Sequence, residues 1–253
     1  MKLTFLGTGT STGVPQIGCT CQVCHSNDYK DKRFRASAII NCNESNLLID
    51  CGPDFRTQIL SCNSPHIDAL LITHSHYDHV GGVDDLRPYC KDIVFPIYCK
   101  ADVCEDLKNR VPYCFTKHPY PGVPSFNLNI IKPGNTFSIN GISIEPLPIM
   151  HYRLEILGFK IGNLAYITDA KTIPLDTIKK ITGIDTLVIN ALRIEEHISH
   201  MTLQDALNII KHTQPRIAYL THISHDMGLH QDVEKSLPEN VKIAYDNLSI
   251  NIN

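Results

Sequence analysis

Residues 72–82 contain the densest set of metal-ligand side chains in this sequence. The segment reads Ile-Thr-His-Ser-His-Tyr-Asp-His-Val-Gly-Gly, so it supplies His74, His76, Asp78 and His79. Alternate side chains of an extended chain point to the same side, which places His74 and His76 together where the preceding strand ends. Imidazole and carboxylate ligands suit zinc, manganese or iron. The segment therefore predicts a metal centre, although a single ion rarely uses four ligands from one such run.

Three further candidate ligands stand at or just after the ends of predicted strands. His151 follows the strand predicted for residues 141–148, Asp169 follows the letters AYIT, and His222 follows RIAYLT. Strand ends are where an α/β sheet presents functional side chains. Taken singly, each of these residues is more typical of a solvated side chain or a helix cap. Together with the 72–82 segment, they indicate one shared site.

A second group of potential ligands lies near the N-terminus. Cys19, Cys21 and Cys24 have the spacing C-x-C-x-x-C, and a closed tetrahedral zinc site needs a fourth ligand besides three thiolates. The candidates are His225, which follows His222 by three residues, and His25, whose position next to Cys24 makes ligation awkward. A redox site or three buried thiols are the alternatives. The other cysteines show no ligand spacing and are expected to be small buried apolar residues; they are Cys42, Cys51, Cys62, Cys90, Cys99, Cys104 and Cys114.

The composition limits the classes of protein to consider. The 253 residues include 10 Cys, 13 His and no Trp, with 23 basic and 26 acidic residues for a formal net charge of −3. That balance argues against a protein that holds nucleic acid through a broad basic face. No apolar stretch reaches the roughly eighteen residues of a membrane span, and the N-terminus lacks the features of a secretion signal. We therefore expect a cytoplasmic protein, whose cysteines are not a disulfide framework.

Strand and helix patterns alternate along the chain, which predicts an α/β fold in a single domain covering residues 1–253. Residues 112–127 hold four prolines and are expected to form a surface loop. The expected strands are 2–7, 36–41, 46–50, 68–73, 94–99, 128–132, 141–148, 156–161, 164–168, 186–191, 216–221, 241–245 and 248–252. The expected helices are 55–62, 101–111, 175–181 and 203–212, the last with Thr202 as its N-cap.

The 73–82 segment resembles the T-H-x-H-x-D-H-x-x-G motif of the metallo-β-lactamase fold superfamily. The later order His151, Asp169, His222 is similar to the motif order of the dinuclear hydrolases in that superfamily. The resemblance implies a four-layer αββα sandwich with the site at one edge of two sheets. It also implies two divalent cations, Zn²⁺ or Mn²⁺, with the ligands divided between them. One ion is assigned to His74, His76 and His151, the other to Asp78, His79 and His222, and Asp169 bridges both.

The N-terminal segment narrows this resemblance to the PhnP-type phosphodiesterases. Their G-T-G…G-V-P-x-x-G-C-x-C-x-x-C start and T-H-I-S-H segment are matched by residues 7–9, 13–15, 18–24 and 221–225. This likeness implies a structural Zn²⁺ on Cys19, Cys21, Cys24 and His225. Such an ion joins the N-terminal loop to the segment that carries His222.

The implied chemistry follows from charge. Two divalent cations less two carboxylates leave +2, and a bridging hydroxide leaves about +1, which favours an anionic substrate. A small anionic phosphodiester, cyclic diesters included, fits such a site, with hydroxide attacking opposite the leaving alkoxide. The redox di-iron branch of the superfamily has a Glu at the position of His76, which argues against oxygen or nitric oxide reduction.

Two further residues near the expected metals have implied roles. His200 resembles the family's histidine that lies beside the metals without binding them, where it protonates the leaving alkoxide or steadies the phosphoryl oxygens. The alternatives are an exposed histidine at a helix start, or His197 in the same role. His200 and Asp78 are thus the predicted catalytic residues. Asp50 resembles an aspartate that supports the ligands rather than binding metal.

Other functions remain open at this stage. One rival is a tRNA 3′-processing nuclease, although the basic arm of that branch is not found in the sequence. Another is a glyoxalase-type thioester hydrolase, which lacks the cysteine knuckle and ends in helices. A non-enzymatic metal-binding or partner-binding protein on the same scaffold is the third. We expect no membrane or nucleic-acid partner, and the sequence leaves a homodimer open.

Overall fold

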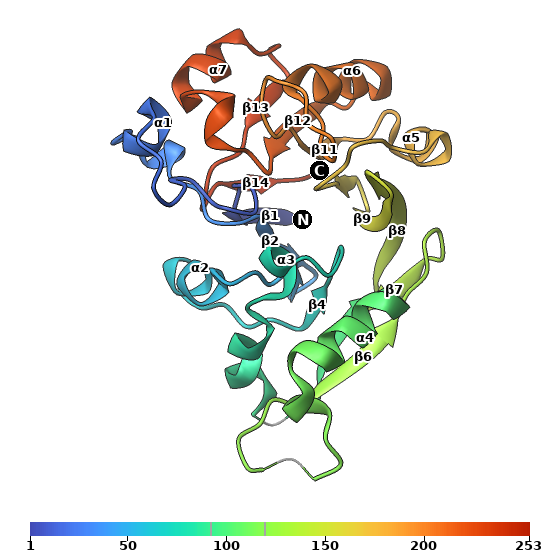
Figure 1. Cartoon of the computed structure of the whole chain (residues 1–253). Helices are drawn as coiled ribbons and strands as arrows, with labels where there is room; N and C mark the ends of the chain where they lie inside the picture. The colour runs from blue at the N-terminus through green and yellow to red at the C-terminus, as the bar shows by residue number, and fades with distance from the viewer. Residues whose placement is uncertain (92, 119) are drawn as a thin grey trace.

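The computed structural model describes residues 1–91, 93–118 and 120–253, whose strands form two sheets (Figure 1). In spatial order the first sheet contains β14 (Ser249–Asn251), β1 (Lys2–Gly7), β2 (Ser37–Cys42), β3 (Ser45–Ile49), β4 (Ala69–Leu71), β5 (Phe95–Cys99) and β6 (Phe126–Ile130). The second contains β13 (Val241–Ile243), β12 (Ile217–Thr221), β11 (Thr186–Asn190), β10 (Leu164–Tyr166), β9 (Leu154–Ile161), β8 (Ile142–His151) and β7 (Phe137–Ile139).

Helices connect the parallel strands of each sheet. The α-helices of the described residues are α1 (Gln22–His25), α2 (Phe55–Ser61), α3 (Tyr77–Val80), α4 (Ala101–Arg110), α5 (Leu175–Ile181), α6 (Leu203–Thr213) and α7 (His230–Ser236). Short 3-10 helices are η1 (Tyr29–Asp31), η2 (Val83–Cys90), η3 (Pro112–Phe115) and η4 (His225–Met227). Strands β3 to β6 pair in parallel, as do β10 to β13. Parallel neighbours need a crossover, and α2, α4, α5, α6 and α7 each lie within one.

The inner strands β3, β4, β10 and β11 are largely buried on both faces, because the other sheet covers one face and outer elements cover the other. In β3, Leu47 and Ile49 face the other sheet, whereas Leu48 packs on the outer side with Phe55 of α2. The outer face of the second sheet packs against α5 and α6 through residues such as Ile181. Figure 1 shows α5, α6 and α7 in the upper part of the view, α2 and α3 near mid-height and α4 below them. The predicted four-layer αββα sandwich is therefore confirmed.

Most predicted elements are present, with differences at the ends. Strand β8 continues past 148 to His151, so this histidine is the last residue of a strand rather than a residue after it. The short strand β7 was not predicted, because its three residues follow a turn and pair only with β8. Helix α7 was also not predicted, since His230 is its only buried residue. The predicted 112–127 loop begins with η3 and ends in β6; it also includes Pro119, which lies outside the described residues.

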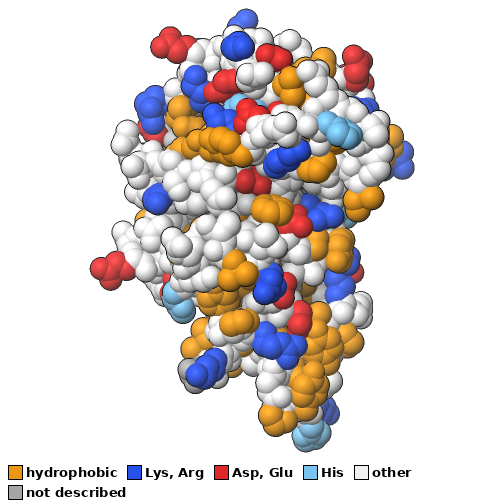
Figure 2. Space-filling view, turned by 90° about the vertical axis from the view of Figure 1, so that its left-hand side faces the viewer, with side chains coloured by type: hydrophobic (Ala, Val, Ile, Leu, Met, Phe, Trp, Pro, Cys, Tyr) orange, Lys and Arg blue, Asp and Glu red, His pale blue; other side chains and the backbone are white. Residues whose placement is uncertain are grey.

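The two ends of the chain lie together at one edge of the first sheet. Strand β1 pairs with β14, and the N-terminal ammonium of Met1 donates to the carbonyl of Ile252. On the face drawn in Figure 2, basic and acidic side chains are intermixed, and hydrophobic side chains gather toward the lower end. Over the described part of the chain, no helix has the length and apolar character needed to cross a membrane.

The layer between the sheets should dominate stability. Ile144 is fully buried there, so Ile144→Ala is expected to lower the free energy of unfolding by about 2–5 kcal/mol. Ile130, on the outermost strand of the first sheet, is 60% exposed, and Ile130→Ala is the matched control, with a loss of about 1 kcal/mol or less. Urea unfolding of both variants measures the difference. Equal losses would contradict the assignment of the main core to the space between the sheets.

Candidate functional site

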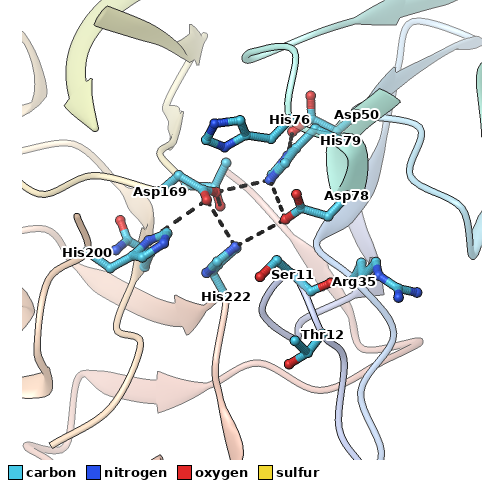
Figure 3. Close-up of polar contacts among 12 residues, drawn as sticks. Ser11, Thr12, Arg35, Asp50, His76, Asp78, His79, Asp169, His200 and His222 are labelled. Carbon is cyan, nitrogen blue, oxygen red and sulfur yellow. Dashed lines mark hydrogen bonds and ion pairs between the residues drawn. The ribbon is translucent and has the colours of Figure 1, made fainter. Parts of the chain in front are cut away.

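The candidate ligands are brought together by strand ends from both sheets. His74 follows β4, Asp169 follows β10, His222 follows β12, and His151 ends β8. Asp78 and His79 lie in the four-residue helix α3, which begins directly after His76. The seven side chains predicted as ligands of two metals therefore meet at one edge of the sandwich (Figure 3 shows most of them).

One group of possible ligand atoms comes from three histidines. The ligand atoms of His74, His76 and His151 all lie within 4.8 Å of one another. Nε2 of His74 is 2.9 Å from Nδ1 of His76, and the ring centroids of His76 and His151 are 5.2 Å apart. Three imidazole nitrogens at this spacing can face a single ion, as sequence analysis expected for the first metal.

The second group contains two carboxylates and two imidazoles. Ligand atoms of Asp78, His79, Asp169 and His222 lie within 4.8 Å of one another, and all four residues are buried. Nε2 of His79 lies 3.1 Å from Asp78 Oδ2 and 3.3 Å from Asp169 Oδ2. Nε2 of His222 lies 3.0 Å from Asp169 Oδ1 (Figure 3). Asp169 also groups with His151 and His200, so it stands between the two sets of ligands, where a bridging residue belongs.

The backbone at this edge is held in conformations that few residues adopt. Asp50, Asp169 and His222 each have φ between 56° and 57°, in the left-handed region. Such backbone is unfavourable for residues with a side chain, and it persists where the surroundings enforce it, often at functional sites. Gly52 allows a close approach: a Cβ there would overlap the carbonyl oxygen of Asp78. The turn after β3 thus presses directly against α3.

Three groups orient the imidazoles. Asp50 Oδ2 accepts from Nδ1 of His79 at 2.7 Å and from the hydroxyl of Thr73 at 2.8 Å. Because the Thr73 hydroxyl donates to Asp50, its oxygen can accept from Nδ1 of His74, 3.0 Å away. The carbonyl of Ser199 accepts from Nδ1 of His151 at 2.9 Å. Each contact uses Nδ1 and leaves Nε2 for a metal, which is the supporting arrangement predicted for Asp50.

Sequence reasoning missed Thr73 and Ser199. Thr73 precedes His74 within the quoted motif, so its position was a usable signal. Ser199 acts through a backbone carbonyl, which no residue type reveals.

The charges in the second group stabilise one another. Burial alone raises the pKa of Asp169, but the imidazoles of His222 and His79 outweigh burial and hold that pKa well below its usual range. The same balance lowers the pKa of Asp78. Burial lowers the pKa of His222, yet Asp169 and Asp78 raise it to about 9. The imidazoles therefore lie where they can offset the charge of the two carboxylates, a position that divalent cations can also fill.

Unpartnered buried nitrogens test whether metals fit here. Nε2 of His79 and both ring nitrogens of His222 are buried without a hydrogen-bond partner among the described residues. Buried polar atoms are normally paired, and Nε2 of both histidines lies 3.0–3.7 Å from carboxylate oxygens of Asp78 and Asp169. A divalent cation would satisfy the two Nε2 atoms, so the donor set fits the implied metals.

His200 lies beside this site. Its Nδ1 is 3.8 Å from Asp169 Oδ1, and its ring stacks on that of His222 with centroids 4.8 Å apart. Burial, followed by the positive charge of His222, lowers the pKa of His200 to about 3. His197, the weaker alternative for the same role, packs against His200 at 5.1 Å but belongs to none of the ligand groups.

The cysteine knuckle is assembled away from these ligands. The sulfurs of Cys19, Cys21 and Cys24 group with His225 within 4.8 Å, and Nδ1 of His225 is 3.5 Å from Cys19 and 3.4 Å from Cys21. His25, the other candidate, contacts the carbonyl of Cys21 and lies outside the group. The backbone N–H of Cys24 lowers the pKa of the Cys21 thiol to about 6, which favours a thiolate ligand.

Backbone pairing ties this knuckle to the metal-ligand edge. Gly9 pairs with Ile223, and hydrogen bonds run from Thr10 to the carbonyl of Ile223 and from Ile223 to that of Thr8. Ile223 lies between His222 and His225. The N-terminal loop and both candidate metal sites therefore share one short segment.

Comparison with known sequences gives two main findings. A model described as the β-lactamase superfamily domain matches residues 45–223. An octanoyltransferase of Porphyromonas gingivalis is 43% identical over 250 residues, which cover 98% of this chain and 51% of that protein. The chain thus spans about half the length of that relative.

Solved structures are also similar. A diphosphatase from the PhnP family matches with a TM-score of 0.93 and 34% identity, covering 100% of this chain and 98% of the other. The Zn²⁺-bound PqqB of Methylobacterium extorquens matches with a TM-score of 0.83 at 18% identity, covering both chains fully. At that identity the second likeness concerns the fold alone.

The geometry predicts three metal ions per chain, two at the strand ends and one at the knuckle. Elemental analysis of protein purified without chelator should find all three, and the double variant C19S/C21S should retain two. Brief EDTA treatment should remove the pair at the strand ends first, because an open site with nitrogen and oxygen ligands exchanges faster than a site with three thiolates.

The matched control is C42S/C114S, which changes two partly buried cysteines outside the knuckle and should retain three ions. Three ions in C19S/C21S would contradict the knuckle assignment.

Proposed function

This chain belongs to the metallo-β-lactamase superfamily, and from that premise we propose that it is a metal-dependent hydrolase of a small phosphodiester or diphosphate. The observation that carries the proposal is the pair of ligand groups with Asp169 between them. The similarity to a PhnP-family diphosphatase over nearly the whole of both chains supports the same reaction class.

The ligand assignment is part of the proposal. His74, His76 and His151 hold one cation, Asp78, His79 and His222 hold the other, and Asp169 bridges them. The candidate ions are Zn²⁺ and Mn²⁺, with a structural Zn²⁺ on Cys19, Cys21, Cys24 and His225. Two divalent cations in such a site lower the pKa of a bound water and stabilise negative charge on phosphoryl oxygens.

Charge selects the substrate class. Asp78 and Asp169 are the two carboxylates among the seven ligands, so two cations leave a net positive site that favours an anionic ester. In the reaction, the water oxygen forms a bond to phosphorus and the bond from phosphorus to the leaving oxygen breaks. Asp50 and the carbonyl of Ser199 keep the imidazoles in place throughout.

We assign His200 to the phosphoryl oxygens. With its pKa lowered to about 3, its ring is neutral near pH 7, and cations nearby lower that pKa further. A neutral imidazole can donate an N–H hydrogen bond to an oxygen on which charge develops, whereas it has no extra proton for the leaving group. Of the two roles left open by the sequence, the stabilising one is therefore favoured.

Two alternatives are tested by substrate choice. One alternative is suggested by the octanoyltransferase relative, which is about twice as long as this chain. The other is the thioester hydrolase that the sequence left open. Octanoyl and lactoyl thioesters therefore belong in the assay beside phosphodiesters. A cytoplasmic location, a homodimer and a single domain remain predictions.

Removal of the bridging residue tests the function. Asp169→Ala should abolish most Zn²⁺- or Mn²⁺-dependent hydrolysis of bis(p-nitrophenyl) phosphate and lower the metal content, because it removes the negative charge between two cations. Asp176→Ala, which changes an exposed aspartate of α5, is the control and should keep full activity. Thioester hydrolysis without phosphodiester hydrolysis by the wild-type protein would overturn the proposal.

The role of His200 is tested with two leaving groups. His200→Ala should slow hydrolysis roughly 10²–10³-fold, by analogy with loss of one oxyanion donor, for both a nitrophenyl ester and a 2′,3′-cyclic nucleotide. A loss confined to the cyclic nucleotide, whose alkoxide needs a proton, would show instead that His200 is a general acid. Metal content should stay unchanged in this variant.

A further inference from the structure

A two-residue turn adjoins the candidate metal site. Strand β8 ends at His151, β9 begins at Leu154, and these two residues pair, so Tyr152 and Arg153 form the connecting turn. Tyr152 has φ 56°, in the left-handed region, where hairpin turns favour glycine or asparagine. Among the described residues, three others with nearly this φ are Asp50, Asp169 and His222, all at the metal-ligand edge. A tyrosine is uncommon in this conformation, and uncommon backbone conformations often occur at functional sites.

The turn lines a pocket together with two of the candidate ligands. The lining residues are His76, His151, Tyr152, Arg153, Leu154 and Ser199. Tyr152 is 46% exposed, and Arg153 is also exposed. A phosphoryl group held by the metals would therefore have one of its substituents beside Tyr152 and Arg153.

Among the described residues, the Arg153 side chain contacts the Tyr152 ring and has no polar partner. Its guanidinium carbon lies 5.1 Å from the centroid of the Tyr152 ring, within cation–π range. In the described ranges, no carboxylate pairs with Arg153 and no hydrogen bond of its side chain is present. Arg110, by contrast, pairs with Asp106 and donates to the carbonyl of Ser75. Ring and guanidinium thus present an exposed π surface beside the metal-ligand edge.

We propose that Tyr152 and Arg153 form a stacking platform for a nucleobase, so that the substrate is a nucleotide ester rather than a simple phosphodiester. Bases stack on tyrosine rings and on arginine guanidinium planes, and this mode tolerates different bases. The inference rests on the proposed phosphodiesterase activity and narrows its substrate class.

A matched pair of chromogenic substrates tests this platform. The p-nitrophenyl ester of thymidine 5′-phosphate and methyl p-nitrophenyl phosphate share leaving group and charge, and only the first carries a nucleoside. The wild-type holoenzyme should prefer the thymidine ester. Tyr152→Gly removes the ring and suits the left-handed backbone, and it should lower kcat/KM for the thymidine ester roughly 5- to 150-fold, mainly through KM. The methyl ester should change less than about twofold, because it makes no stacking contact.

Other variants separate stacking from charge and from folding. Tyr152→Phe should retain the preference, and Arg153→Ala should weaken it. If Arg153 acts only as a charge, Arg153→Ala will slow both esters equally, which would overturn its part in the platform. Tyr29→Ala in η1 and Arg56→Ala in α2 change exposed residues elsewhere and should leave both rates unaltered. Metal content and melting temperature should match the wild-type protein in every variant.

Failure of the stacking platform can be distinguished from failure of the proposed function. Equal rates on the two esters, unchanged by Tyr152→Gly, would reject the platform and leave the phosphodiesterase function standing. No hydrolysis of either ester with Zn²⁺ or Mn²⁺ would reject the function, and this inference with it.

Discussion

The structure depends on the burial of two carboxylates at the edge where the two sheets meet. Asp78 and Asp169 are 7% and 2% exposed, and among the described residues the ion-pair partners of their carboxylates are imidazoles. A buried carboxylate without a cation nearby is costly, so each residue that positions His79 and His222 also stabilises the fold at this edge. The left-handed backbone at Asp50, Asp169 and His222 serves the same convergence, because Asp50 and His222 directly follow strands and Asp169 lies three residues after β10.

A second set of contacts joins the N-terminal loop to the segment that carries His222 and His225. Arg33 is buried and donates to the hydroxyl of Thr8 and to the carbonyl of Ala244, which lie at opposite ends of the chain. Thr8 in turn donates to Asp246, and burial raises the pKa of Asp246 to about 6. Together with the Gly9–Ile223 pairing, these contacts hold the start of the chain against the segment that carries His222 and His225. A structural zinc at the knuckle would complete this connection from the outer side.

The proposed cations and the walls of the site would contribute differently to substrate recognition. The two cations proposed for the ligand groups would provide positive charge without selectivity among anions, and a neutral His200 would add a directed hydrogen bond. Selectivity then has to come from the walls of the site. The Tyr152–Arg153 turn is such a wall, since it adjoins His151 in sequence and leaves an aromatic ring and a guanidinium exposed.

The sequence alone predicted a metal site, and its resemblance to a known family predicted the layer order. Histidine and aspartate residues at fixed spacing indicated metal ligands, and apolar runs such as DALLIT indicated buried strands. Tertiary structure decided what depends on distance between segments: the choice of His225 over His25, the contact of Asp50 with His79, and the carbonyl of Ser199 on His151. It also lowers the pKa of His200, through burial and through His222, a neighbour 22 residues away in the chain. These features escape the sequence because burial, electrostatic neighbours and backbone acceptors arise only when strand ends from two sheets converge.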